Sequence, residues 1–365
     1  MLDRVHGSMR SMDAKAVEAA VSRVVVAALG RAPDRLQSLV GGRRVNRAGA
    51  HLEPEVAAAL RLMETRSQKD FTDLTPDESR RGMEEDAALV GGSPLPMAAV
   101  EDLEVPTFAG PLRARRYLAP HRDADRLMVY FHGGGFVVGS LDSHDVLCRF
   151  LATHAGVSVL SVDYRLAPEH PFPAAVDDAK AAFMFAAAKA ASWGHDPARI
   201  GVGGDSAGGN LAAVLCQGLR GARVRPAFQL LLYPVTDVSR HSSSYREFAE
   251  GYLLTERQMN WYTDHYLGDG DRTDPRVSPL LAEDLSDLPP AYVAVAGFDP
   301  LRDEGEAYAR RLAESGTQVA LRRHDGLIHG FASTTGVGSS SREAFLEACG
   351  AVRMGLGAGL VRHAD

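Results

Sequence analysis

The spacing of hydrophobic residues divides this chain into two parts. Through the first 95 residues, apolar side chains recur at helical spacing and predict helices over 13–30, 53–66 and 76–90. Few runs in this part have the pattern of a strand. We therefore expect residues 1–95 to form a helical N-terminal segment, which ends at a Gly-Gly-Ser-Pro sequence typical of a boundary.

From about residue 99, short apolar runs alternate with longer helical stretches. Apolar runs without alternation indicate strands that are buried on both faces. Strands that alternate with helices indicate an α/β fold, in which a mostly parallel sheet is flanked by helices. The predicted strands cover 100–107, 112–118, 127–132, 157–162, 200–203, 228–233, 291–296 and 319–323. The predicted helices between them cover 143–155, 173–192, 207–219 and 303–315.

One segment, 238–286, interrupts this alternation. It is rich in charged and aromatic residues, and we interpret it as helices inserted between two strands of the sheet. The α/β core is therefore expected to consist of 96–237 and 287–365, with 238–286 as an inserted helical segment.

Composition excludes several classes of partner. The net charge of −7 argues against nucleic-acid binding, which needs a positive surface, and gives no attraction to an anionic membrane. No uncharged apolar run reaches the roughly 18 residues that span a bilayer, so no stable membrane insertion is expected. The three cysteines are widely spaced and predict neither a disulfide framework nor a metal site. Because the N-terminus also lacks the pattern of a signal peptide, we expect a cytoplasmic protein.

A candidate nucleophile lies between a predicted strand and a predicted helix. Gly204, Asp205, Ser206, Ala207 and Gly208 form a Gly-x-Ser-x-Gly motif. In a strand-turn-helix setting this motif holds a serine on a strained turn above the sheet, and the two glycines relieve the crowding there. The segment fits neither the dinucleotide-binding glycine pattern nor the phosphate-binding loop that ends in Gly-Lys-Ser/Thr.

A glycine run follows the predicted strand 127–132. His132 is followed by Gly133, Gly134 and Gly135. Acyl transfer needs backbone N–H groups that point at the carbonyl oxygen as it becomes negative, and consecutive glycines let the main chain come close enough. We expect the N–H groups of Gly134, Gly135 and Ala207 to form this oxyanion hole, while Gly133 shapes the turn. His132 precedes the serine, so we interpret it as a brace for the loop rather than as the base.

The general base should follow the serine in the chain, since the order in these hydrolases is Ser, Asp or Glu, then His. The histidines after Ser206 are His241, His265, His324, His329 and His363. The first two lie in the inserted segment. His329 lies in a glycine-flanked loop after the last predicted strand, so it is the first candidate, and His324 is the second.

The acid should lie at the C-terminal end of a strand, where the catalytic groups of open α/β sheets gather. Asp299 follows the predicted strand 291–296 in this position, and it would orient His329 and stabilise its protonated form. Asp303 and Glu304 compete for this role. However, negative charge in the first turn of a helix has a sufficient structural reason.

Five motifs together resemble the bacterial branch of the hormone-sensitive lipase family of esterases. They are HGGGF at 132–136, DYRLAPEHPFP at 163–173, GDSAGGN at 204–210, DPLRDEG at 299–305 and HGF at 329–331. The resemblance covers about 100–350 and implies an α/β-hydrolase fold with a catalytic triad. It further implies a serine carboxylesterase whose substrates are small-molecule carboxylic esters with short chains. Hydrolysis would proceed through an acyl-enzyme intermediate, without metal or cofactor.

The resemblance also carries expectations about architecture. The segments 1–95 and 238–286 correspond to the two parts of a helical cap in this family. Many members form dimers through the last strand of the sheet, which implies a homodimer through the edge between Val319 and Arg323.

Other functions fit the same residues. The same groups could cleave an amide or a carbohydrate acetyl ester, because the fold does not determine the substrate. A non-catalytic receptor with this fold is a second alternative, although such receptors usually lack a triad member and Ser206, Asp299 and His329 are all present. Lipase action on lipid aggregates is a third, which the negative charge and the short-chain preference of the family disfavour.

Overall fold

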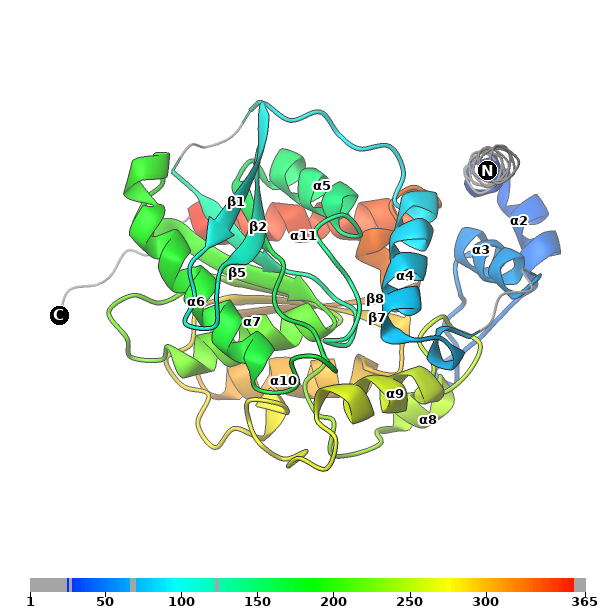
Figure 1. Cartoon of the computed structure of the whole chain (residues 1–365). Coiled ribbons are helices and arrows are strands. Elements are labelled where there is room, and N and C mark those ends of the chain that lie inside the picture. Colours follow the sequence, from blue (N-terminus) through cyan, green and yellow to red (C-terminus); the bar gives the residue numbers. More distant parts are fainter. Residues whose placement is uncertain (1–24, 26–27, 66–69, 122–124, 358–365) are drawn as a thin grey trace, which may run out of the picture.

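The central feature of the fold is one twisted sheet (Figure 1). A computed structural model of the chain describes residues 25, 28–65, 70–121 and 125–357. Within these residues, eight strands form a single sheet in the order β1-β2-β4-β3-β5-β6-β7-β8. In chain order the strands are β1 (Ala99–Val105), β2 (Leu112–Leu118), β3 (Leu127–Phe131), β4 (Ser158–Val162), β5 (Ile200–Asp205), β6 (Gln229–Leu232), β7 (Ala291–Phe298) and β8 (Val319–Ile328). The predicted α/β class is confirmed.

Strand direction brings the ends of distant segments together. The pairs from β4 through β3, β5, β6 and β7 to β8 are parallel, whereas β2 runs antiparallel to both β1 and β4. The C-terminal ends of parallel strands meet at one edge of a sheet, so the loops after β3, β5, β7 and β8 lie along the same edge.

Helices cover both faces of the sheet. One hydrophobic cluster joins one face to α6 (Ala174–Lys189), α7 (Ala207–Gly218) and α10 (Arg302–Glu314). A second cluster joins the other face to α5 (Asp145–Ala155) and α11 (Ser339–Gly357).

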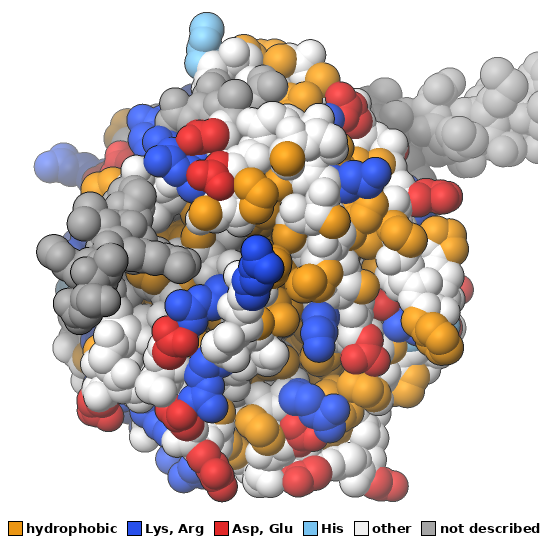
Figure 2. All heavy atoms as spheres, turned by 90° about the vertical axis from the view of Figure 1, so that its left-hand side faces the viewer, with side chains coloured by type: hydrophobic (Ala, Val, Ile, Leu, Met, Phe, Trp, Pro, Cys, Tyr) orange, Lys and Arg blue, Asp and Glu red, His pale blue; other side chains and the backbone are white. Residues whose placement is uncertain are grey.

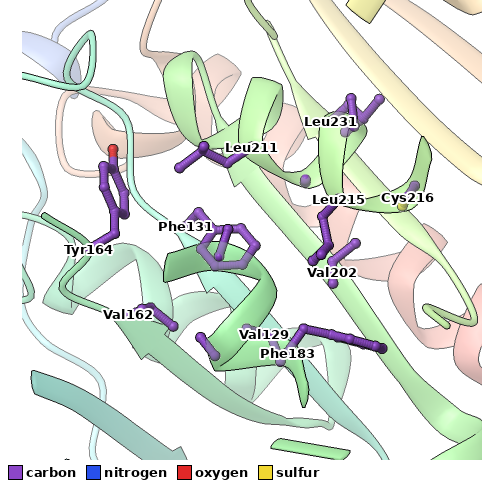
Figure 3. Close-up of a cluster of buried hydrophobic side chains, with 14 of the residues drawn as sticks. Val129, Phe131, Val162, Tyr164, Phe183, Val202, Leu211, Leu215, Cys216 and Leu231 are labelled. Atoms are coloured by element: carbon purple, nitrogen blue, oxygen red, sulfur yellow. The ribbon is translucent and has the colours of Figure 1, made fainter. Parts of the chain in front are cut away.

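Alternation along the strands explains the two clusters. In β3, Val129 and Phe131 belong to the first cluster, while Met128 and Tyr130 belong to the second. Figure 3 shows Phe131 in the first cluster, beside Leu211 of α7. Full burial of a side chain of this size contributes about 1.5–3 kcal/mol. A central strand that is buried on both faces must therefore be apolar along its whole length.

The N-terminal part contains helices, as predicted. They are α2 (Asp34–Gly41), α3 (Pro54–Thr65), a 3-10 turn at Phe71–Asp73 and α4 (Pro76–Val90). Thr75 and Glu78 form a capping box that starts α4, and such a cap satisfies backbone N–H groups that the helix leaves free. Of the predicted helix over 13–30, only residues 25 and 28–30 are described, as helix, and the rest lies outside the described residues.

Contacts of two residues, Arg80 and Val56, tie this N-terminal part to the sheet. Arg80 of α4 donates hydrogen bonds to the backbone oxygens of Val137 and Ala167, each at 2.9 Å, and pairs with Glu169 at 2.6 Å. Val56 of α3 belongs to the second hydrophobic cluster. The helix α4 is therefore held beside the loop that follows β3.

The inserted segment between β6 and β7 contains two short helices, α8 (Ser243–Glu247) and α9 (Glu256–Tyr266), and a 3-10 turn at Pro279–Leu281. The rings of Trp261 and Tyr262 on α9 lie 5.4 Å and 5.3 Å from the ring of Phe71. The two segments outside the predicted core therefore contact each other.

Strand β8 is longer than its sequence pattern predicts. It continues to Ile328, so residues 324–328, including His324 and the first part of the predicted loop, are strand. Because β8 is an edge strand, residues 320–323 are all exposed, and two of the four, Arg322 and Arg323, are charged.

The surface carries charge of both signs. Figure 2 shows Lys and Arg side chains interspersed with Asp and Glu on the face that lies at the left in Figure 1. In the part of the chain that the structure describes, no helix is long and apolar enough to cross a membrane.

Candidate active site

Ser206 lies on a sharp turn between β5 and α7. Its backbone has φ 55° and ψ −117°, a region that residues with a side chain rarely adopt. The neighbouring backbone is packed so closely that a Cβ atom on Gly208 would lie 1.9 Å from the carbonyl oxygen of Phe131. One on Gly204 would lie 2.3 Å from the carbonyl carbon of Gly208. Gly204 and Gly208 are therefore required because a larger side chain would clash with the neighbouring backbone. The turn raises Ser206 above the end of the sheet.

The predicted base and acid lie in line with this serine. The Nε2 atom of His329 is 3.0 Å from Oγ of Ser206, and its Nδ1 atom is 2.9 Å from Oδ2 of Asp299. An ionised carboxylate only accepts, so Nδ1–H donates to Asp299 and leaves Nε2 free to accept the serine proton. All three residues are buried, with exposed fractions of 9%, 8% and 0% for Ser206, His329 and Asp299.

The carboxylate of Asp299 is fixed from a second direction. Its Oδ1 atom accepts a hydrogen bond of 2.9 Å from the backbone N–H of Leu301, in the turn before α10. The ring of Tyr233 lies against His329, with 4.7 Å between the ring centres. Both partners restrict the motion of the groups that must stay aligned.

The glycine run after β3 lies beside the serine turn. Gly134 and Gly135 have φ values of +116° and +59°, and within the described residues no acceptor takes their N–H groups. Ala207 is the first residue of α7, where backbone N–H groups have no partner inside the helix. The N–H of Gly133 is already used, because it donates to Oδ1 of Asp205 at 3.0 Å. Gly134, Gly135 and Ala207, which the sequence singled out, therefore have N–H groups without an acceptor in the described part of the chain, whereas that of Gly133 is taken.

Asp205 joins the serine turn to the glycine loop. Besides Gly133, its Oδ1 atom accepts a hydrogen bond of 2.8 Å from the hydroxyl of Tyr130, and His144 Nε2 lies 3.4 Å from the carboxylate. Burial opposes ionisation, but His144 and the Tyr130 hydrogen bond together hold the pKa of Asp205 below its usual value. Ser143 in turn contacts Nδ1 of His144 at 2.9 Å. Asp205 is therefore a buried carboxylate that positions the loop.

His132 braces the same loop. It is fully buried, its Nδ1 atom lies 2.8 Å from the backbone oxygen of Gly133, and its ring stacks on Tyr164 at 4.3 Å. Burial, and then the nearby His144, lower the pKa of His132 to about 3, so the ring is neutral and Nδ1–H donates to Gly133. It has no contact with Ser206 through which it could act as base.

A cavity opens over Ser206, with walls formed largely by the inserted segment. Tyr262 of α9 lies directly on Gly135, where a Cβ atom would be 2.1 Å from the ring. Tyr266 stacks on Phe136 with 3.8 Å between ring centres. The inserted helix therefore packs against the glycine loop itself and restricts the space in front of the serine.

The competing residues lie elsewhere. His324 is within β8 and packs against Phe331 at 5.1 Å. Asp303 accepts a hydrogen bond of 2.8 Å from the backbone N–H of Ser244. Glu304, for which the start of α10 is a sufficient reason in the sequence alone, lines the cavity together with Ser206. The cavity position of Glu304 has no sequence signal, because it depends on the inserted segment.

The described residues include no cluster of metal-ligating side chains, and their three cysteines are buried. No group of three His, Cys, Asp or Glu side chains there is close enough to hold a metal ion. Cys148, Cys216 and Cys349 are free and buried, and burial raises the pKa of each thiol, so these cysteines are inert.

Known proteins of similar sequence and structure are hydrolases. Residues 128–333, more than half of the chain, match a family described as the alpha/beta hydrolase fold. The carboxylic ester hydrolase LipN of Mycobacterium tuberculosis is 50% identical over 262 residues, which are 70% of each chain. An ethyl acetate hydrolase of Pseudomonas putida is 42% identical over 291 residues, 77% of this chain and 92% of that protein.

Solved structures that resemble this chain are also ester hydrolases. An ester-hydrolase from the metagenome of Lake Arreo superposes with a TM-score of 0.80 and 44% identity, covering 84% of this chain and 99% of that one. A hyperthermophilic esterase from Pyrobaculum calidifontis gives a TM-score of 0.79 at 38% identity, with the same coverage of 84% and 99%.

Proposed function

Because this chain belongs to the α/β-hydrolase family and is a carboxylic ester hydrolase of its bacterial hormone-sensitive lipase group, we propose that Ser206 is its nucleophile, His329 its general base and Asp299 the acid that orients the base. The observation that carries this proposal is the pair of contacts made by one imidazole, 3.0 Å to Ser206 and 2.9 Å to Asp299.

The reaction has two steps. In the first, His329 Nε2 takes the proton of Ser206 as Oγ attacks the ester carbonyl, and the N–H groups of Gly134, Gly135 and Ala207 bind the oxygen as it becomes negative. His329 then donates the proton to the leaving alcohol, and the acyl group stays on Ser206. In the second, His329 takes a proton from water, hydroxide attacks the acyl-enzyme, and the acid leaves.

The substrate class that we propose is a short-chain carboxylic ester. Two observations support it. Tyr262 and Tyr266 narrow the cavity at the glycine loop, which leaves little room for a long chain. One relative is named as an ethyl acetate hydrolase, which is an enzyme for a short ester.

Replacing Ser206 with alanine tests the assignment. With p-nitrophenyl esters from acetate to palmitate, the natural protein should be most active on short chains. The variant should lose activity by about 10³-fold or more, with an unchanged melting temperature. Near-normal activity of the variant would overturn the role of Ser206, and a maximum at long chains would point to a lipase instead. Turnover of amides or of acetylated sugars in place of simple esters would change the substrate class but not the triad.

We further propose that 1–95 and 238–286 act together as a cap on the core formed by 96–237 and 287–365. The packing of Phe71 on Trp261 and Tyr262 supports a joint role for the two segments. Substitution of Phe71 by alanine should then raise KM more than it lowers kcat, because the cap binds substrate without taking part in the chemistry. Steady-state kinetics that show only a fall in kcat would contradict this role.

For assembly and location we propose a cytoplasmic homodimer. Strand β8 is at the edge of the sheet and Leu321 is 41% exposed on it, which supports pairing between Val319 and Arg323 of two copies. The free thiols support a reducing compartment. Light scattering that gives a monomer mass at all concentrations would refute the dimer, and recovery of the native protein in an extracellular fraction would refute the location.

A further inference from the structure

We propose that Glu304 forms a polar subsite in the catalytic cavity, at which its carboxyl group binds an oxygen atom of the substrate other than the scissile ester. The substrate class is then an ester whose chain carries a second acceptor oxygen, such as a ketone or an ether. The inference rests on the proposed function, because it uses the same cavity.

The lining of the cavity is mostly apolar and includes Phe136, Val235, Tyr262 and Leu301 along with Ser206. Its charged or titratable members besides Glu304 and Tyr262 are Asp237, Arg240, His241, Tyr245, Tyr266 and Arg272. In a pocket of this kind, a few polar groups determine which ligands fit. Glu304 is such a group, since it is only 6% exposed and yet belongs to the lining.

One of the two carboxyl oxygens of Glu304 is held by the backbone. Its Oε1 atom accepts hydrogen bonds from the backbone N–H groups of Thr236 at 2.7 Å and Asp237 at 3.2 Å. Within the described residues, Oε2 has no hydrogen-bond partner and no basic side chain pairs with Glu304. The group is therefore held rigidly and has one oxygen left for a ligand.

The subsite is close to the nucleophile along the backbone. Val235 donates its N–H to the backbone oxygen of Ser206 at 3.2 Å, and the next residue, Thr236, donates to Glu304. A chain that is bound with its ester at Ser206 can therefore reach Glu304 within the same cavity.

The other buried carboxylate in the lining differs from Glu304. Oδ1 of Asp237 accepts from both the N–H and the hydroxyl of Ser239, and its Oδ2 lies 3.5 Å from Arg240. Asp237 is thus satisfied by its own neighbours. Of these two carboxyl groups, that of Glu304 alone has an oxygen without a hydrogen-bond partner in the described part of the chain.

The protonation state of the Glu304 carboxyl group determines which kind of substrate atom it can bind. Burial, with help from the nearby Asp237 and Asp299, raises the pKa of Glu304 to about 8 although the two backbone N–H groups oppose this. Near pH 7 the group is therefore mostly a neutral acid, whose O–H donates to an acceptor oxygen. An acid in this state does not supply the negative charge that would stabilise the start of α10, so the helix alone does not account for a glutamate here.

The test compares two esters that differ only in the second oxygen. One is p-nitrophenyl 4-oxopentanoate and the other is p-nitrophenyl 4-methylpentanoate, which has nearly the same shape. For the alcohol side, 2-methoxyethyl butanoate is compared with butyl butanoate. The measured quantity is the ratio of kcat/KM within each pair. This ratio cancels differences in folding or in the amount of active enzyme.

Two variants separate the subsite from a structural role. Glu304→Gln keeps an oxygen for Thr236 and Asp237 and an N–H for the substrate, but it does not titrate. Glu304→Met keeps the volume and removes both. In the natural protein the oxygen-containing ester of at least one pair should be preferred by roughly three- to tenfold at pH 6.5, the worth of one hydrogen bond. The preference should fall as the pH passes 8, stay constant in Glu304→Gln, and vanish in Glu304→Met.

Ratios near one for both pairs in the natural protein would overturn the subsite, as would the same ratios in all three proteins. The failure of the proposed function is a different result, namely equal activity of Ser206→Ala and the natural protein. A binding measurement needs no turnover: calorimetry on Ser206→Ala should show methyl 4-oxopentanoate binding at least threefold more tightly than methyl 4-methylpentanoate, and equal affinities would refute the subsite.

Discussion

Replacement of Asp205 by alanine should damage catalysis although Asp205 does not contact the substrate. Its carboxylate accepts hydrogen bonds from Gly133 N–H at 3.0 Å and from the Tyr130 hydroxyl at 2.8 Å. Both donors are in the interior, where water cannot replace the lost acceptor. The loop that carries Gly134 and Gly135 would then lose the shorter contact of its first residue and keep the one of 3.3 Å from Gly133 N–H to Nε2 of His144.

The magnitude follows from the donors that lose this acceptor. A buried donor left without a partner costs about 1–3 kcal/mol, so the Tyr130 hydroxyl alone should lower the free energy of unfolding of the alanine variant by about that amount. The weakened contact of Gly133 adds to this loss. For catalysis, the loss of one oxyanion donor lowers kcat by about 10²–10³-fold, and a displaced loop should have a similar effect. Asparagine offers one oxygen to both donors, so Asp205→Asn should lose only about tenfold in kcat.

The assay combines steady-state kinetics with denaturant unfolding of both variants. Because the oxyanion contact exists mainly in the transition state, kcat and kcat/KM should fall together while KM changes little. If KM rises at constant kcat, or if asparagine is as damaging as alanine, the reasoning is wrong. A variant that is too unstable to study would leave Asp205→Asn, whose pH–rate profile should keep the shape of the natural one.

Two further predictions concern the cavity. Gly135→Ala would place Cβ 2.1 Å from the Tyr262 ring at φ +59°, so kcat/KM should fall by at least about tenfold, and the added change Tyr262→Ala should restore part of it. Gly194→Ala, at φ +79° in open space, is the matched control for backbone strain, and equal losses at both glycines would refute the steric explanation. Glu304 should make the protein less stable as the pH rises, because folding raises its pKa from 4.5 to about 8. This loss of stability is absent below pH 4.5 and complete above about pH 8. The difference in melting temperature between Glu304→Gln and the natural protein should therefore increase in favour of the variant between these limits. A difference that does not change with pH would contradict a buried acid.

Hydrophobic pattern alone predicted most of the sheet. The strand β3 was recognisable because it is buried on both faces, which requires an apolar run. The end of β8 was not, because the missed residues 324–328 begin with His324, Asp325 and Gly326, which interrupt the apolar pattern. Helix α2 was also missed. Its eight residues contain only one buried side chain, Gln37, and so carry no apolar stripe.

The site was easier to predict where chemistry restricts the residue type. Ser206, Asp299 and His329 could be proposed from motif and order, since each follows a strand at the same edge of the sheet. The positions of Tyr262 and Glu304 in the cavity could not, because they depend on how the inserted segment folds over that edge. Asp205 was known only as part of the motif, and its contact with Gly133 joins two segments 72 residues apart.

The position of His329 also bears on how activity appears during folding. The imidazole is carried by the end of β8, the outermost strand, and it meets a serine 123 residues earlier in the chain. Closing so long a loop is entropically costly, so contacts of this range form slowly. During refolding, hydrolysis can return only after β8 has paired with β7. With His329 as the proposed base, the recovery of enzyme activity therefore reports the pairing of this edge strand, whereas the serine turn and the glycine loop can be in place before any turnover is seen.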